Sequence, residues 1–165
     1  MALIIEDGTI IVGAESYVTA AEATTYHSNR GNTTWAGTDT VKDAALLKAA
    51  AYLDGHYCKR FKGTKYQPLD QNMQWPRIGV VIDGFVLDVD VIPQRLKDAQ
   101  CELALIALSA DLAPSVSAGI KREKVDVLET EYFAGAPAGT TVYTAVNNLL
   151  ADLLKPLNST DAVRG

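Results

Sequence analysis

The chain has 165 residues, 48% of them hydrophobic and 21% charged, a composition that excludes a wholly disordered protein and fits one globular domain. Twenty acidic against fifteen basic residues give a net charge of −5, whereas proteins that mainly wrap nucleic acid usually carry the opposite sign. No apolar run is long enough to cross a membrane, no signal-peptide pattern opens the chain, and two cysteines are too few for a disulfide framework. We therefore expect a protein made in a reducing cytoplasm, with one domain over residues 1–157 and a mobile tail at 158–165.

The N-terminal region predicts an arm followed by a short helix. Two β-branched runs within residues 3–12 flank an Asp-Gly dipeptide, which tolerates the backbone angles of a tight turn, so we expect a short hairpin or an extended arm. Thr19 and Glu22 have the spacing of a capping box, in which hydroxyl and carboxylate satisfy free backbone N–H groups. This pattern predicts a helix that runs to about Asn29.

A second helix is expected from about Val41 to Phe61, because apolar residues recur there at helical spacing. Gly55 marks either a weak position in this helix or a close contact with another helix. The following stretch, residues 62–92, has no helical period and predicts a long irregular connection, a feature often associated with function. An Asp-Gly pair at 83–84 between apolar runs indicates a small hairpin within it.

A third helix should begin at Pro93 and end before Pro114, since proline suits the first turn of a helix and stops a later one. It carries two apolar stripes, which predict either the centre of a bundle or a contact between subunits. Residues 120–133 alternate apolar and charged side chains, as a half-buried strand or hairpin does, and a last helix is expected from about Ala145 to Leu154. The predicted fold is mainly α, a small bundle of about four helices with a β-hairpin or extended arm and a long loop.

The residues that usually carry catalysis are few. His27 and His56 are the only histidines, and the latter lies two residues from Cys58, a spacing that points the two side chains to different faces of a helix. Cys58 and Cys101 sit in apolar helical patterns and are expected to be small buried residues. We therefore predict no enzyme activity, no catalytic residues, no metal site and no cofactor.

One segment has the character of a nucleic-acid surface. Residues 57–66 place Lys59, Arg60, Lys62 and Lys65 among three aromatic residues, so that cations would follow phosphates while rings stack on bases. The alternative is that Tyr57 and Phe61 continue the core stripe and the cations favour the negative end of the helix. The spacing leaves both interpretations open.

A second short segment, Trp75-Pro76-Arg77, also has two interpretations. Tryptophan and arginine are enriched among the residues that anchor protein interfaces, which makes these three residues candidates for partner binding. Alternatively, Trp75 covers the core, Pro76 sets the direction of the chain and Arg77 pairs with a carboxylate. Leu157, at the end of the Leu-rich last helix, is a further candidate for partner binding.

Motifs over about residues 6–155 resemble a family of small tailed-phage proteins. The segments that carry the resemblance are 6–9 (EDGT), 14–19 (AESYVT), 49–54 (AAAYLD), 74–77 (QWPR), 92–104, 121–125, 131–132, 135–139 and the final Leu-rich helix. Members of this family are often labelled DnaT-like ssDNA-binding proteins, but they look like head-to-tail connectors, the head completion or adaptor proteins of the phage neck.

This resemblance implies a structural virion protein rather than an enzyme. It implies an adaptor that joins the portal protein to a stopper or tail component, assembles with neighbouring copies as a ring, expected to be a dodecamer, and forms part of the conduit through which DNA passes without specific binding. Such a protein would be found in the virion neck, and in the host cytoplasm during assembly, with no membrane contact. The alternative function is single-stranded DNA binding through Lys59, Arg60, Lys62 and Lys65.

Overall fold

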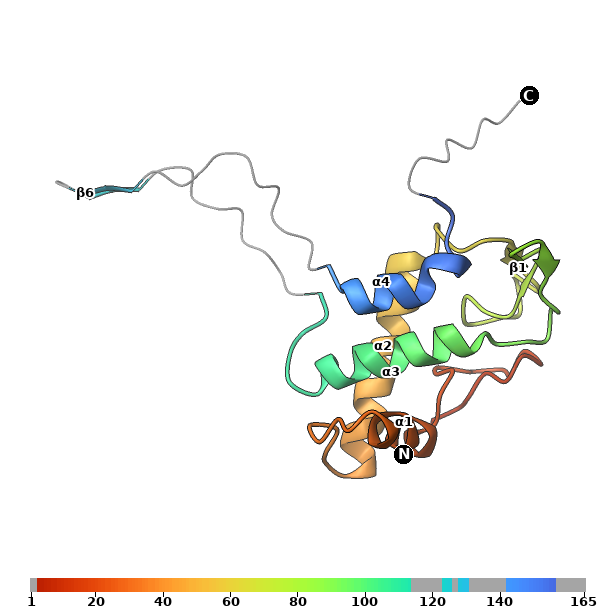
Figure 1. Ribbon diagram of the computed structural model, residues 1–165, viewed down its shortest axis with the longest axis horizontal. Coiled ribbons are helices and arrows are strands. Elements are labelled where there is room, and N and C mark those ends of the chain that lie inside the picture. Colours follow the sequence, from red (N-terminus) through yellow and green to blue (C-terminus); the bar gives the residue numbers. More distant parts are fainter. Residues whose placement is uncertain (1–2, 114–122, 126–127, 131–141, 157–165) are drawn as a thin grey trace.

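The computed structural model describes residues 3–113, 123–125, 128–130 and 142–156. These residues form four α-helices and three two-stranded antiparallel sheets, which confirms the predicted mainly α fold (Figure 1). The elements are α1 (Ala20–Asn29), α2 (Asp39–Tyr57), β1 (Thr64–Lys65), β2 (Arg77–Ile78), β3 (Val81–Ile82), β4 (Phe85–Val86), α3 (Gln94–Ala107), β5 (Glu123–Val125), β6 (Leu128–Thr130), α4 (Thr144–Leu150) and the 3-10 turn η1 (Ala151–Leu153).

The capping box at the start of α1 forms as predicted. The backbone N–H of Glu22 donates to the Thr19 hydroxyl at 3.1 Å, and the N–H of Thr19 donates to the Glu22 carboxylate at 2.8 Å. α3 begins directly after Pro93, also as predicted. α2 starts at Asp39 and ends at Tyr57, four residues before its predicted end, because the chain turns away there.

The core lies where the helices cross. Figure 1 shows α2 passing behind α3 and α4, and α3 packs against α1, α2 and α4. The fully buried side chains at these crossings include Leu46, Leu53, Leu96, Leu103 and Leu150. The apolar stripes of α3 therefore face other helices of the same chain, which matches the bundle-core interpretation of this helix.

Residues 3–12 do not pair as a hairpin. The buried carboxylate of Glu6 accepts hydrogen bonds from the backbone N–H groups of Gly8, Ile10 and Ile11, at 2.9 to 3.0 Å. In a hairpin these N–H groups would bond to a partner strand. Here the Glu6 carboxylate accepts those hydrogen bonds instead. A single parallel bridge between Ile5 and Ser16 ties the arm to the chain just before α1.

The long connection between α2 and α3 is more regular than the sequence predicted. β3 and β4 form the hairpin expected around Asp83 and Gly84, while β1 pairs with β2 across a loop. β5 and β6 pair within the predicted segment 120–133. Within the described residues, no helix combines the length and apolar character that a membrane crossing requires.

The two cysteines differ. Cys101 is buried, as predicted, and burial raises the pKa of its thiol to about 12. Cys58 is only half-buried, since it lies at the C-cap of α2 where the chain leaves the core.

Candidate nucleic-acid interface

The basic segment, residues 59–65, leaves the end of α2 and is held on one side by residues 153–155. The N–H of Lys62 donates to the carbonyl of Leu153 at 2.9 Å, and the N–H of Lys155 donates to the carbonyl of Arg60 at 2.7 Å. These bonds flank an antiparallel bridge between Phe61 and Leu154. The fold therefore places the backbone of Lys155 beside this segment, a neighbour that sequence spacing does not reveal.

The other side of the basic segment is held by Arg77. Its guanidinium donates to the carbonyls of Lys62 at 2.7 Å, Gly63 at 2.8 Å and Gln74 at 3.2 Å. Burial lowers the pKa of this guanidinium, and its donors point at backbone rather than at solvent. Arg77 thus fixes the path of the segment from inside the protein, with no carboxylate as its hydrogen-bond partner.

Gly63 lets the segment pass close to β2. Its φ of +65° lies in the left-handed region that favours glycine, and a Cβ there would stand 2.3 Å from the carbonyl oxygen of Ile78. Any side chain at this position would push the segment away from the hairpin sheets.

The cations of the segment differ in their surroundings, and Lys65 interacts electrostatically with the carboxylate of Asp54. Lys59 is exposed and Arg60 is half-buried, while the ammonium groups of Lys62 and Lys65 each donate to a backbone carbonyl at 3.2 Å, those of Val81 and Gln71. In the part of the chain that the structure describes, none of the four forms an ion pair. The exposed Lys59 is therefore the most available of the four to an anion from outside.

Two of the three aromatic residues of this segment are not available for base stacking. Tyr57 and Phe61 are each 1% exposed, because they continue the α2 stripe into the core. Burial raises the pKa of Tyr57 to about 12, and its hydroxyl donates to Asn147 on α4 at 2.7 Å. The core interpretation of these two rings is confirmed, and their predicted role in stacking is wrong.

Tyr66 and Phe85 are the exposed rings near the segment. Tyr66 is 43% exposed, and Phe85, on β4, is 79% exposed. The Phe85 hairpin contacts the segment through the bond from Lys62 to Val81, which lies on the paired strand β3. Sequence reasoning missed Phe85 because it is twenty residues beyond the segment; its place beside an Asp-Gly turn was the available signal.

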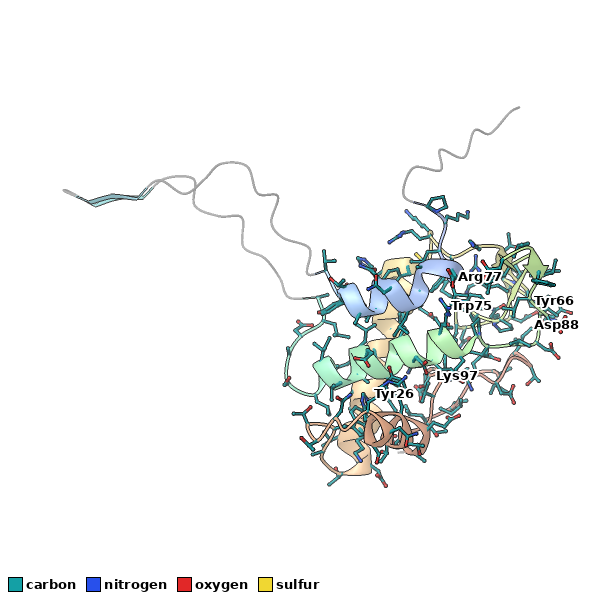
Figure 2. The ribbon with its side chains drawn as sticks, in the orientation of Figure 1. Tyr26, Tyr66, Trp75, Arg77, Asp88 and Lys97 are labelled. Carbon is teal, nitrogen blue, oxygen red and sulfur yellow. The ribbon has the colours of Figure 1, made fainter. Side chains whose placement is uncertain are left out.

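Of the four residues predicted to bind a protein partner, the three at positions 75–77 lie inside the fold. Trp75 has no exposed surface, packs edge-to-face on Phe61 at 5.8 Å between ring centroids, and Pro76 and Arg77 are also buried. Figure 2 shows Trp75 and Arg77 in the interior, whereas Tyr66 and Asp88 lie at the outer edge. This placement favours the interpretation in which Trp75 covers the core. Leu157 and the predicted tail lie outside the described residues.

The histidines belong to different surroundings. His27 is buried, with Nε2 at 3.2 Å from the carbonyl oxygen of Cys101 and Nδ1 at 3.1 Å from the Asn32 amide. His56 is exposed on α2. No group of three or more His, Cys, Asp or Glu side chains that would suit a metal ion occurs among the residues the structure describes.

Comparison with known proteins gives one match. A family model described as "Putative DnaT-like ssDNA binding protein" matches residues 1–165. Neither the curated proteins nor the solved structures contain a match to this chain.

This match corrects the predicted function. The description names single-stranded DNA binding, so the prediction of a virion connector in the phage neck is wrong and the alternative function is the one supported. The connector prediction came from the resemblance, and two sequence features were compatible with it. The apolar stripes of α3 are covered by other helices rather than by neighbouring copies, and the net charge of −5 does not report local charge. The portal, ring and tail partners followed from the connector alone, and no finding tests them.

Proposed function

Because the chain belongs to the family of DnaT-like ssDNA-binding proteins, we propose that it binds single-stranded DNA through the basic segment, residues 59–65. The observation that carries this proposal is the family match over the whole chain. Lys59 is exposed, Lys62 and Lys65 are half-buried, and none of the three forms an ion pair among the residues that the structure describes, which supports the segment as the contact with a phosphate backbone.

The proposed contact combines charge with stacking. Lys59, Lys62 and Lys65 would neutralise successive phosphates and release the counterions bound to them, which makes affinity depend on salt concentration. Tyr66 and Phe85 would present rings to bases, and ring stacking accepts any base because each has a π-face. Arg77 is a positioning residue, since its guanidinium donates to the backbone of Lys62 and Gly63 and to Gln74, and lies 5.8 Å from the centroid of the Phe61 ring.

The proposal accounts for an acidic protein that binds an acidic polymer. Asp83, Asp88 and Asp90 are exposed on the hairpin side, so phosphates are repelled there while the cations attract them beside it. A strand therefore meets a restricted path rather than a broadly positive surface. This arrangement predicts modest affinity and a preference for flexible single strands over rigid duplexes.

The test is binding of a fluorescent oligothymidylate of about 15 nucleotides, measured by anisotropy over a range of salt concentrations. In a triple variant, Lys59, Lys62 and Lys65 are each replaced by Gln. The slope of log K against log salt should decrease by about 2, because each phosphate that is no longer neutralised contributes about 0.7 to the slope.

The matched control removes the same charge from ion-paired cations, through Arg30→Gln, Arg95→Gln and Lys97→Gln. Its salt slope should stay at the wild-type value. Absence of oligonucleotide binding by the unmodified protein at about 50 mM salt would refute the proposed function. An equal decrease in both triple variants would show that binding depends on total charge and not on the basic segment.

A further inference from the structure

The outer face of α2 leads away from the basic segment and carries a second set of rings and cations. Positions 48, 51, 52, 55, 56 and 59 recur at helical spacing and are Lys, Ala, Tyr, Gly, His and Lys. All of them are exposed except Tyr52, which is half-buried. Because positions 51 and 55 carry small residues, the rings of Tyr52 and His56 are the largest side chains on this face between Lys48 and Lys59.

The rings form a stacked pair. The centroids of Tyr52 and His56 lie 5.0 Å apart, with an angle of 9° between the planes. Tyr143, just before α4, meets Tyr52 edge-to-face at 5.5 Å, which braces the inner ring against the body of the protein. His56 is thus an exposed ring on a rigid support, the arrangement that suits stacking of a further planar group.

The charges on this face favour a polyanion. Lys48 stands at one end of the face and Lys59 just beyond the end of α2, and neither side chain forms a hydrogen bond or ion pair within the described residues. Asp54 does not lie on the outer face, because it accepts from the Tyr17 hydroxyl at 2.7 Å and the N–H of Gln74 at 2.9 Å. The exposed Asp111, which follows α3, lines one pocket with Lys48, Ala51 and Tyr52, so one carboxylate stands beside the Lys48 end of the face.

The surface on the other side of the basic segment, over the β3–β4 hairpin, is less favourable for phosphates than α2. There Phe85 is well exposed, but Asp83, Asp88 and Asp90 are exposed as well. These carboxylates repel phosphates, whereas α2 offers the exposed Lys48. A phosphate backbone bound at Lys59 is therefore more favourably placed along α2 than over the hairpin.

We propose that the outer face of α2 is the track along which single-stranded DNA extends from the basic segment, with bases stacked on the Tyr52–His56 pair and phosphates at Lys48 and Lys59. This inference rests on the proposed function and adds the path of the strand. From Lys48 to Tyr57, its last residue, α2 rises about 14 Å, a length that about four stacked nucleotides cover, and Lys59 lies two residues beyond the helix. The stacking is independent of base identity, so the track would give affinity without sequence preference.

The experiment compares His56→Ala and Tyr52→Leu with Tyr26→Leu, a variant that removes a ring stacked under Arg30 on another face. Two labelled oligothymidylates are used, one intact and one with abasic sites at its centre. On the intact strand each α2 variant should weaken binding about tenfold with an unchanged salt slope, since the variant removes stacking on a base and leaves the phosphates neutralised. On the abasic strand the same variants should bind as the wild type does.

The charged ends of the track give a second readout. Lys48→Gln with Lys59→Gln should reduce the salt slope on both strands by about 1.4, with each of the two phosphates contributing about 0.7. Circular dichroism checks that the variants are folded, and His56→Ala carries the test if Tyr52→Leu is not, because His56 is exposed.

The outcomes separate the two proposals. If the wild type fails to bind the intact strand at about 50 mM salt, the proposed function itself is refuted. If the wild type binds and neither His56→Ala nor Tyr26→Leu changes the affinity, the track is refuted. Binding through the basic segment is then retained as the proposal. Equal binding of duplex DNA, whose bases are stacked internally, would also refute stacking on this face.

Discussion

Cations lie on two surfaces of this molecule, and the surfaces differ in how those cations are compensated. On the α1 and α3 side, Arg30 lies 4.0 Å from Asp98, Lys97 lies 3.8 Å from Glu22, and Arg95 pairs with Asp152. At the end of α2 the basic segment forms no ion pair among the described residues. A net charge averages these surfaces, whereas a phosphate responds to the local field.

The rings on the two surfaces differ in the same way. On α1 the ring of Tyr26 lies beneath Arg30, with the guanidinium carbon 3.5 Å from its centroid, and its hydroxyl donates to Glu102. On α2 the ring of Tyr52 is stacked on His56, which is exposed. Figure 2 shows Tyr26 and Lys97 on the side of the molecule where α1 and α3 lie. Among the described residues, the surface at α2 and the basic segment combines an exposed ring with cations that form no ion pair.

The largest expected effect is on the free energy of unfolding, when the buried Arg77 is replaced. Arg77 lies on neither of the two surfaces. Arg77→Ala removes donors to three backbone carbonyls and should lower the free energy of unfolding by about 3 kcal/mol, since buried acceptors lose charged partners. Urea denaturation measures this decrease. Arg77→Lys should recover only part of it, because an ammonium lacks the planar fork. A decrease below about 1 kcal/mol would contradict the positioning role.

Stability on the α1 side should depend on pH through His27. Burial lowers the pKa of His27 below its ordinary value of 6.5, so the unfolded chain binds this proton more readily than the folded chain. The stabilisation is therefore present above pH 6.5 and is lost as the pH falls from there toward the lowered pKa. Urea midpoints measured from neutral to mildly acidic pH should decrease in the wild type.

His27→Gln provides the control for this pH dependence, because an amide does not titrate in this range. The decrease in its urea midpoint with pH should be smaller than in the wild type. An identical decrease in both proteins would assign the pH dependence to other groups.

Gly55 tests how closely the α2 surface is packed. The structure decides between the two predicted roles of this residue, since a Cβ at Gly55 would meet no atom within 4 Å, so the position is not a close helix contact. Gly55→Ala should raise the free energy of unfolding by about 1 kcal/mol, because alanine loses less backbone freedom in a helix. Thermal unfolding measures the gain; a decrease in stability would show that the α2 face is tighter than its exposure indicates.

The smallest expected effect is on oligothymidylate affinity, when the ion pairs of the α1 and α3 surface are removed. Glu22→Gln with Asp98→Asn frees Lys97 and Arg30, and Gln at position 22 still completes the capping box. The salt slope for oligothymidylate should become steeper by about 0.7 for each cation that gains a phosphate, with an affinity change below about threefold. An unchanged slope would mean that the shape of the surface, and not ion pairing, separates the two regions.

Local features of the fold were predictable from the sequence. Thr19 and Glu22 interact across three residues, and the Asp83-Gly84 turn needs only its own strands, so the α1 cap and the β3–β4 hairpin were predicted correctly. The end of α2 was not, because Phe61 leaves the helix to bridge Leu154, a partner more than ninety residues later.

The candidate site was predictable only in part. Its cations are adjacent in the sequence, and their pattern was recognised. Spacing alone does not separate a ring that stacks on a ligand from one that continues a core stripe, so the burial of Tyr57 and Phe61 needed the structure. The three donors of Arg77 and the bridge at Leu154 depend on segments brought together by folding.

The bridge between Phe61 and Leu154 also bears on how this protein should be shortened or tagged. A version that stops before Leu153 would lack the acceptor for Lys62 and the donor to Arg60, and the backbone of the basic segment would be free on that side. Such a truncation would look like a failure of ligand recognition although every lysine of the segment remained. Shortened versions should therefore retain residues up to Lys155, and affinity handles are better attached at the opposite terminus.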